Sequence, residues 1–285
     1  MPGPFRYATP ETENLFESLA HSADVGIDGL QGSPTIREKA MALLSRRALT
    51  SGILGLTILV GSAADLRAQT SALRGPAVVE LFTSQGCSSC PPADRVLGEL
   101  STMPNVIALA FHVDYWDNIG WRDPFSISNA VERQHRYVQA LNLSSAFTPQ
   151  AVIDGHSSFV GSDKGRILNA LANATGDTVP VTLEVSDGVL TVTLPESQDR
   201  TLYSVFLAAY LPQASTPVGR GENSGRTLQE FNIVRQFRSI GSWSGHAAMF
   251  RSSVSSFPAD ASRVAVLVQR DGQGAIAGSA AIALR

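Results

Sequence analysis

Apolar runs and helical spacing alternate between residues 76 and 113. The run PAVVELFTS is apolar and β-branched, which is typical of a strand buried on both faces. In PPADRVLGEL, which follows, apolar residues recur at the spacing of one helical face: Ala93, Val96, Leu97 and Leu100. NVIALAFHV is a second run of the buried-strand kind. This order predicts a parallel strand–helix–strand unit.

An aromatic and polar stretch, DYWDNIGWRDPFS (114–126), separates this unit from a second helical seam in SISNAVERQHRYVQAL. FTPQAVIDGHSSFVG then predicts two short strands around the favoured turn pair Asp154–Gly155. SDKGRILNALANA follows as a helix with Ser162 as its N-cap. The order is β-α-β-α-β-β-α, and we expect residues 75–175 to form one α/β domain.

Alternation with a period of two replaces the helical pattern after residue 176. VPVTLEVSDGVLTVTLP predicts a hairpin around Asp187–Gly188, and further strand candidates follow towards the C-terminus. We therefore expect residues 176–285 to form a second, antiparallel β domain resembling a sandwich.

Composition and charge exclude some classes of function. The chain is 44% apolar and 16% charged, with a net charge of −3, as in an ordinary soluble globular protein. Lys and Arg show neither an excess nor a cluster, which argues against nucleic-acid binding. A chain of 285 residues can bury a core that does not depend on a disulfide for stability.

Residues 41–68 have the layout of an export signal. Arg46 and Arg47 form a positive head, and an uncharged stretch and a small-residue cleavage pattern follow. The signal is twin-arginine-like or general, and the alternative is a single membrane anchor. We expect a periplasmic or secreted protein that touches the membrane only through an uncleaved signal, in a compartment where disulfides persist.

Residues 1–40 do not fit a signal head, because they carry six acidic and three basic side chains. Our interpretation is that translation starts at Met41 and that residues 1–40 are a mis-assigned start or a disordered tail.

The two cysteines of the chain, Cys87 and Cys90, lie three positions apart in SQGCSSCPPAD. A structural staple, a metal clip and a redox pair are all open. A disulfide that closes a ring of four residues restricts the unfolded chain little and stabilises the fold by only about 2 kcal/mol, which weakens the staple interpretation. At the start of a helix, Cys87 would be an exposed nucleophile and Cys90 the thiol that resolves a mixed disulfide.

Two features complicate the redox interpretation. Pro91 and Pro92 delay the start of the regular helix, which weakens the help of its dipole at Cys87. The two thiolates and His112 could instead hold Cu(I), although they lack a full zinc set. We therefore expect no metal or other cofactor, with copper delivery as an alternative function.

The element order, the CxxC pair and Thr148–Pro149 at a strand entrance resemble the thioredoxin fold. More closely, the chain resembles a bacterial family of exported thioredoxin-like proteins, classed as domain of unknown function 1223. The matching motifs are VVELFTSQGCSSCPPAD, HVDYWDNIGWRDPFS, FTPQAVIDG and RGENSGRT. The resemblance implies a cis Thr148–Pro149 bond, with Thr148 presenting its backbone to a substrate peptide. It implies little about the substrate.

Other residues are open to two interpretations. Glu80 is an acid inside a buried strand: it could be the general base for Cys90, or it could pair with an arginine for structure alone. Tyr115, Trp116 and Trp121 could line a substrate groove or cover the core. In the motif RGENSGRT, a solvated loop between strands is the favoured interpretation, and the alternative is that its polar side chains reach across to the active face: Arg220, Glu222, Asn223 and Arg226.

The sequence favours a thiol–disulfide oxidoreductase that exchanges with protein thiols or disulfides outside the cytoplasm. Such an enzyme also needs a redox partner protein. Copper delivery and a non-catalytic interaction module that merely kept the fold remain alternatives from other classes.

Overall fold

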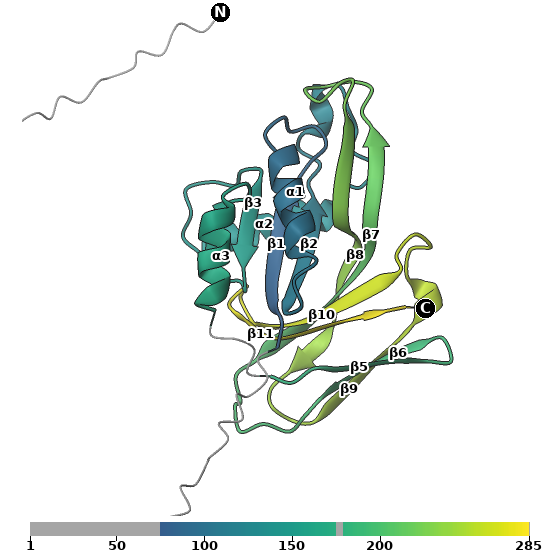
Figure 1. Cartoon of the computed structure of the whole chain (residues 1–285). Coiled ribbons are helices and arrows are strands. Elements are labelled where there is room, and N and C mark those ends of the chain that lie inside the picture. Colours follow the sequence, from purple (N-terminus) through teal and green to yellow (C-terminus); the bar gives the residue numbers. More distant parts are fainter. Residues whose placement is uncertain (1–74, 175–178, 285) are drawn as a thin grey trace, which may run out of the picture. The chain divides into compact units, whose positions relative to one another are not determined.

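The computed structural model describes residues 75–174 and 179–284. The expectations for residues 1–40 and for the export signal at 41–68 lie outside this part of the chain. Among the described helices, none is both long and apolar enough to cross a membrane. The described residues form a mixed α/β structure around one large sheet (Figure 1).

The helices and strands of the first part follow the predicted order. They are β1 (Ala77–Thr83), α1 (Pro91–Leu100), β2 (Val106–His112), α2 (Ser128–Ala140), β3 (Gln150–Ile153), β4 (Ser157–Val160) and α3 (Lys164–Ala172). As predicted for a strand–helix–strand unit, β1 and β2 are parallel. β3 is antiparallel to β1, and β4 is antiparallel to β3. A short 3-10 turn, Asp117–Ile119, lies within the aromatic stretch.

Both predicted hairpin turns are present. Asp154 and Gly155 have φ angles of 47° and 69°, and Asp187 and Gly188 have φ angles of 51° and 72°. These left-handed angles are those that a two-residue hairpin turn requires, and Asp and Gly tolerate them well.

The N-cap of α3 differs from the prediction by one residue. Asp163, rather than Ser162, holds this position, because its carboxylate accepts the backbone N–H of Arg166 at 3.1 Å.

The second part adds strands to the same sheet. Its strands are β5 (Thr182–Ser186), β6 (Val189–Leu194), β7 (Tyr203–Pro217), β8 (Thr227–Trp243), β9 (Ala248–Ser253), β10 (Arg263–Arg270) and β11 (Ile276–Ala283). The eight-stranded sheet has the order β11-β10-β7-β8-β2-β1-β3-β4, with β8 parallel to β2 at Ala110 and Ile233. Strands from both sides of the expected boundary near residue 176 therefore share one sheet.

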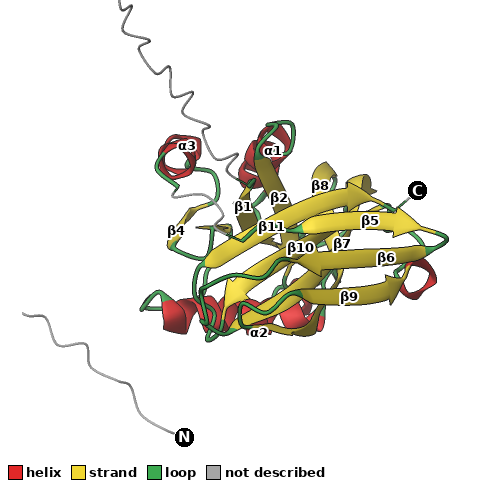
Figure 2. Cartoon of the chain, turned by 90° about the horizontal axis from the view of Figure 1, so that it is seen from below, coloured by secondary structure: helices red, strands yellow, loops and turns green. Residues whose placement is uncertain are grey.

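The remaining strands form a separate antiparallel sheet of three, in the order β5-β6-β9 (Figure 2). One apolar cluster joins this sheet to the strands of the larger sheet, and includes Leu190 and Val192 of β6 with Val205, Leu207 and Val266. Burial of these alternating positions holds the two sheets together.

Alternation along β1 sorts its side chains onto two covered faces. Val78 and Phe82 pack in the core that contains Tyr137 of α2. Val79 and Leu81 pack in the core that contains the apolar face of α1. Both faces are dry, as predicted for a central strand. The even-numbered residues of β1 face α2, and the odd-numbered ones face α1.

β7 and β8 form a long hairpin of 15 and 17 residues. We call residues 218–226 the hairpin tip; its base is closed by the Val218 N–H, which donates to the Arg226 carbonyl, and by the Gly225 N–H, which donates to the Val218 carbonyl. Gly221 and Gly225 have φ angles of 76° and 79°, which glycine adopts without strain. The length of the two strands brings the hairpin tip to the loop that carries the cysteines.

Candidate functional site

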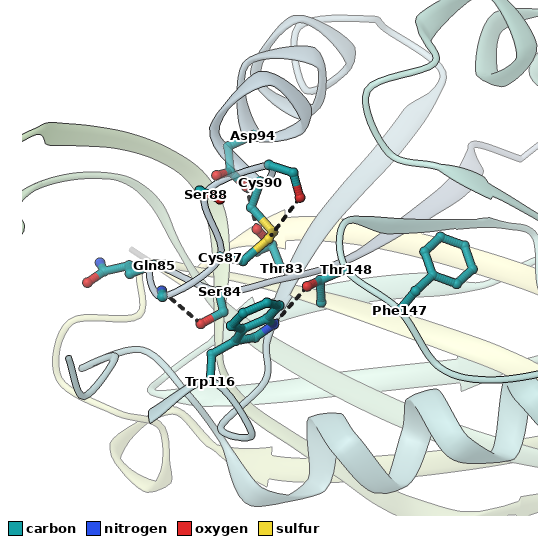
Figure 3. The surroundings of a disulfide bond; sticks show 12 residues. Thr83, Ser84, Gln85, Cys87, Ser88, Cys90, Asp94, Trp116, Phe147 and Thr148 are labelled. Carbon is teal, nitrogen blue, oxygen red and sulfur yellow. Dashed lines mark hydrogen bonds between the residues drawn. A yellow bond between two sulfur atoms is a disulfide. The ribbon is translucent and has the colours of Figure 1, made fainter. Parts of the chain in front are cut away.

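The site centres on the disulfide between Cys87 and Cys90 (Figure 3). The two Cα atoms are 5.4 Å apart, and Cys90 is the N-cap of α1, which begins at Pro91 as predicted. Pro91 and Pro92 have no N–H to offer. Backbone donors for a Cys87 thiolate must therefore come from the loop itself and not from the first turn of the helix.

Both cysteines are buried, with an exposed fraction of 0% each. The expectation that Cys87 is exposed is therefore wrong for the disulfide form. Ser88 and Ser89, between them, remain exposed, and the Ser89 hydroxyl lies 3.3 Å from Cys87 Sγ. Segments distant in sequence surround the loop, and they account for the burial.

The peptide bond between Thr148 and Pro149 is cis, as the resemblance implies. Trp116 Nε1 donates to Thr148 Oγ1 at 2.8 Å, and the indole lies between Thr148 and the loop with the cysteines (Figure 3). A Cβ atom on Gly86 would come within 2.8 Å of Trp116 Cβ. The glycine before Cys87 is thus what lets Trp116 approach.

The predicted substrate-binding residues divide into two groups. Thr148 and Trp116 lie beside the disulfide (Figure 3), and Pro149 follows Thr148 through the cis peptide bond. Tyr115 is exposed by 39% and donates to Gln134 of α2 at 3.3 Å. A role in binding substrate remains a prediction for all four.

Glu80 is buried, and of its two interpretations the structure has the second, an ion pair with an arginine. Arg133 of α2 donates from Nε to Oε1 at 2.6 Å and from Nη2 to Oε2 at 3.0 Å. The hydroxyl of Tyr137 also donates to this carboxylate. The reason is the parity of the strand, because Glu80 shares the α2 face with Val78 and Phe82, whereas Cys90 caps α1 on the other face.

The acid on the α1 side is Asp94, which the sequence analysis missed. It lies one helical turn after Cys90, and its backbone N–H donates to the Cys90 carbonyl at 3.1 Å. Thr83 Oγ1 donates to its carboxyl at 2.8 Å. Burial raises the pKa of Asp94 to about 7, although nearby His112 and the Thr83 hydroxyl act to lower it. The sequence signal that could have identified Asp94 is its position four residues after Cys90, one turn further on in a half-apolar helix.

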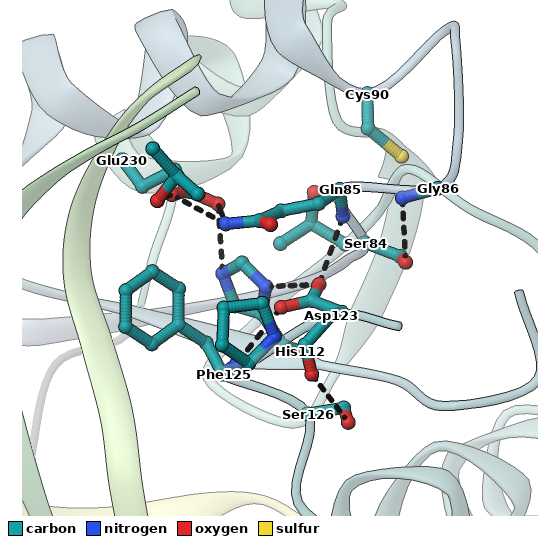
Figure 4. Close-up of polar contacts among 12 residues, drawn as sticks. Ser84, Gln85, Gly86, Cys90, His112, Asp123, Phe125, Ser126 and Glu230 are labelled. Atoms are coloured by element: carbon teal, nitrogen blue, oxygen red, sulfur yellow. Dashed lines mark hydrogen bonds and ion pairs between the residues drawn. The ribbon is translucent and has the colours of Figure 1, made fainter. Parts of the chain in front are cut away.

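His112 is close enough to Asp94 for its charge to act on that carboxyl, and it lies with Asp123 and Glu230 in a buried cluster (Figure 4). Its Nδ1 is 2.7 Å from Asp123 Oδ2, and its Nε2 is 3.9 Å from Glu230 Oε1. Burial opposes a charge on this imidazole, but the carboxylates of Asp123, Glu230 and Asp94 raise its pKa to about 9. The imidazole is therefore protonated at neutral pH.

Two further acids complete the cluster. Burial raises the pKa of Glu230, although His112 and Gln85 act to lower it. Burial also disfavours the Asp123 carboxylate, but the charge of His112 prevails and lowers its pKa. We call Asp94, His112, Asp123 and Glu230 the acid cluster.

Gln85 ties the acid cluster to the cysteine loop. Its backbone N–H donates to Asp123 Oδ2 at 2.8 Å, and its Nε2 donates to both Glu230 oxygens at 2.9 Å (Figure 4). Trp121 Nε1 donates to Gln85 Oε1 at 2.9 Å. One buried amide thus connects β8, the aromatic stretch and the loop that holds the disulfide.

The hairpin tip contacts the cysteine loop directly. Asn223 Nδ2 donates to the carbonyls of Gln85 and Cys87 at 2.9 Å each, and Ser88 N–H donates to Glu222 at 3.0 Å. The solvated loop expected for RGENSGRT is therefore wrong for Asn223, which is fully buried. Nothing in the local sequence marks this contact, because the distance between the segments closes only when β8 joins β2.

A metal centre finds no support in the described ranges 75–174 and 179–284. No group of three or more His, Cys, Asp or Glu there is arranged to hold a metal ion. Of the ligands proposed for copper, Cys87 and Cys90 are bonded to each other, and His112 Nδ1 is engaged by Asp123.

Comparisons with known proteins find similar solved structures but no match among curated proteins. The crystal structure of protein AGR_C_4864 from Agrobacterium tumefaciens is similar, with a TM-score of 0.64 and 27% identity over 74% of this chain and 96% of that chain. HBP35 of Porphyromonas gingivalis gives a TM-score of 0.49 and 15% identity over 73% of this chain and 75% of that chain.

A sequence profile of one family covers most of the described residues. The profile is described as "Protein of unknown function (DUF1223)" and matches residues 78–269, which include the cysteine loop, the acid cluster and the hairpin tip. The chain belongs to this family, as its motifs indicate.

Proposed function

We propose that this protein is an extracytoplasmic thiol–disulfide oxidoreductase that exchanges with protein thiols or disulfides through Cys87 and Cys90. The observation that carries the proposal is a disulfide at the start of α1 with a buried, titratable acid one turn further on. Perturbed acids beside a reactive group are typical of functional sites, whereas a staple needs no such neighbour.

The proposal includes a thioredoxin-like arrangement for residues 75–175. The element order, the parallel pairing of β1 with β2 and the cis Thr148–Pro149 bond support it. Such an arrangement presents the backbone of Thr148 to an extended peptide substrate.

The chemistry follows from the pair. In the reducing direction, the Cys87 thiolate attacks one sulfur of a substrate disulfide, and the other substrate sulfur leaves as a thiolate. The ionised Asp94 carboxylate takes the proton of Cys90, whose thiolate then attacks Cys87 Sγ. The Cys87–Cys90 disulfide forms as the second substrate thiolate leaves. Two electrons pass to the substrate, and oxidation of a dithiol substrate is the reverse of these steps.

Location is part of the proposal. Residues 41–68 have the layout of an export signal, and a two-cysteine protein outside the cytoplasm meets substrates with disulfides. A redox partner protein there would restore the starting state of the pair.

Trapping tests the proposal with the full chain. The reduced Cys90→Ser variant is mixed with insulin, whose disulfides serve as the probe, and mixed disulfides are identified by non-reducing electrophoresis and mass spectrometry. We expect a stable adduct on Cys87, and none with Cys87→Ser; the exposed control His156→Gln should turn over insulin at a rate close to that of the unmodified protein. Absence of an adduct with Cys90→Ser, together with no insulin reduction by the unmodified protein, would refute the proposal.

A further inference from the structure

The disulfide cannot react in the arrangement that the structure describes. A thiolate must approach Cys87 Sγ along the S–S axis, and both cysteines have an exposed fraction of 0%. Some part of the surroundings must therefore move before exchange takes place.

Glu230 of β8 bonds the Gln85 side chain, and two further segments distant in sequence contact the cysteine loop: the aromatic stretch and the hairpin tip. The aromatic stretch is held firmly. Trp116 packs on Gly86 and bonds Thr148, and the buried Asp123 carboxylate accepts the backbone N–H of Gln85. Moving this stretch would separate Asp123 from the Gln85 N–H and from His112, and would leave the protonated imidazole buried without this counter-charge, which makes the movement costly.

The hairpin tip is held more weakly. Asn223 is its one buried residue between 219 and 226, and the others are exposed or half-buried. Three hydrogen bonds, from Asn223 and to Glu222, attach it to the cysteine loop. Exposed loops with few buried contacts open at the lowest free-energy cost. The hairpin tip is thus the segment that opens first.

We propose that residues 219–225 form a gate over the cysteine loop and that Asn223 is the positioning residue that closes it. The inference deepens the proposed function, because the gate decides which thiols reach Cys87. When the gate is closed, Asn223 fixes the carbonyls of Gln85 and Cys87, and Glu222 occupies the N–H of Ser88.

Glu222 links the gate to the redox state of the pair. The bonds from Ser88 lower the pKa of the Glu222 carboxyl, so that it is ionised at neutral pH. Reduction adds the negative charge of a Cys87 thiolate, one residue from Ser88, to the negative charge of Glu222. With Pro91 and Pro92 unable to donate, the Ser88 N–H is one of few groups that can stabilise the thiolate. Closure therefore favours the disulfide, and reduction favours opening.

Reduction kinetics of the full oxidised chain test the gate. Dithiothreitol is varied in excess at pH 7, and the rate is followed by mass spectrometry after acid quench. In the unmodified protein we expect the rate to reach a plateau, because opening becomes limiting. We expect Asn223→Ala to be reduced about tenfold faster, without a plateau in the same range, and Glu222→Gln about threefold faster.

Ser224→Ala is the matched control, since the Ser224 hydroxyl bonds the Gly219 carbonyl within the tip and, among the described residues, has no hydrogen bond to the cysteine loop. It should be reduced at the rate of the unmodified protein. Glu222→Gln keeps the test decisive if Asn223→Ala does not fold, because Glu222 is exposed. Melting temperatures of the oxidised variants show whether a faster rate reflects global loosening.

Rates equal to that of the unmodified protein in both tip variants would overturn the proposal. So would faster reduction that merely follows a lowered melting temperature, or a large acceleration in Trp116→Ala with none in Asn223→Ala. Dithiothreitol reduces an accessible disulfide whatever its biological role. A failure of the trapping experiment with insulin would therefore leave this result standing, and the two proposals fail separately.

Discussion

Two buried ionic clusters lie on opposite faces of the same sheet, and they differ in charge balance. On the α2 face, the carboxylate of Glu80 meets the guanidinium of Arg133 in a two-point contact, and Tyr137 and Gln269 complete the hydrogen bonds. On the α1 face, three carboxyl groups of the acid cluster share the single imidazole of His112.

The polar atoms of the two clusters are also satisfied to different degrees. Arg133 is additionally enclosed by aromatic rings, and its Cζ lies 4.4 Å from the centroid of the Phe237 ring. His112 Nε2 finds no hydrogen-bond partner among the described residues. An ion pair with balanced charges and complete hydrogen bonding fixes geometry. Buried carboxyl groups that outnumber the buried positive charges must instead keep some of their protons near neutral pH. This difference supports a structural role for the first cluster and, within the proposed function, proton transfer for the second.

The largest expected effect is on the matched pair. Glu80→Gln leaves the guanidinium of Arg133 buried without its counter-charge, which should destabilise the oxidised protein by about 4 kcal/mol in urea unfolding. The exposed pair of Arg136 with Glu132 supplies the control, because Glu132→Gln should cost less than about 0.5 kcal/mol. A loss of less than about 1 kcal/mol in Glu80→Gln would remove the structural assignment.

The strand pattern predicted that Glu80 is buried and shares a face with Val78 and Phe82, and this is confirmed. It did not predict which helix covers that face. Side-chain alternation shows which residues share a face but not which helix packs on it. The handedness of the crossover places α1 on the face of Val79 and Leu81. A position seven residues before Cys87 was therefore insufficient to choose a base.

Asp94→Asn should have the next largest effect, with the opposite sign. The folded protein holds the pKa of Asp94 at about 7 through burial, against 3.8 in the unfolded chain. The neutral acid therefore favours the folded state at low pH, and this contribution is lost as the pH rises through about 7. We expect Asp94→Asn to stabilise the oxidised protein by about 3 kcal/mol at pH 8 and to give little gain near pH 4. Equal gains at both pH values in urea unfolding would contradict this account.

His112 should give a smaller effect in a higher pH range. Its pKa, raised by its acidic neighbours to about 9 from 6.5, makes a stabilising contribution that is complete below about pH 6.5. This contribution, on the order of 2 kcal/mol, is lost as the pH rises through about 9. His112→Gln should flatten that loss in urea titrations, whereas the exposed control His156→Gln should retain it. A loss that persists unchanged in His112→Gln would place the titrating group elsewhere.

Trp116→Phe should give the smallest effect. It removes the bond to Thr148 Oγ1 and keeps an aromatic ring against Gly86, so we expect a cost of about 1 kcal/mol in thermal unfolding. If Trp116 also binds substrate, as predicted, KM for a protein disulfide should rise while kcat changes little. A fall in kcat alone would assign Trp116 to the reaction step instead.

The parts of the site that the sequence missed have a common cause. The cysteine pair and the cis Thr148–Pro149 bond lie in short local motifs, and they were predicted. Asn223 and Glu230 belong to the β7–β8 hairpin, more than 130 residues after the cysteines. Their position depends on the continuation of the first sheet by β8, which no local pattern encodes.

The equilibrium reduction potential of the Cys87–Cys90 pair, measured against glutathione at pH 7, distinguishes an exchanging pair from a structural disulfide. Structural disulfides have potentials below about −300 mV, and exchanging pairs lie above that value. The account predicts a potential above about −300 mV, with Glu222→Gln higher than the unmodified protein. A value near −270 mV would favour reduction of substrates, and one well above it would favour their oxidation. A potential below about −300 mV would contradict the account and make the disulfide a staple.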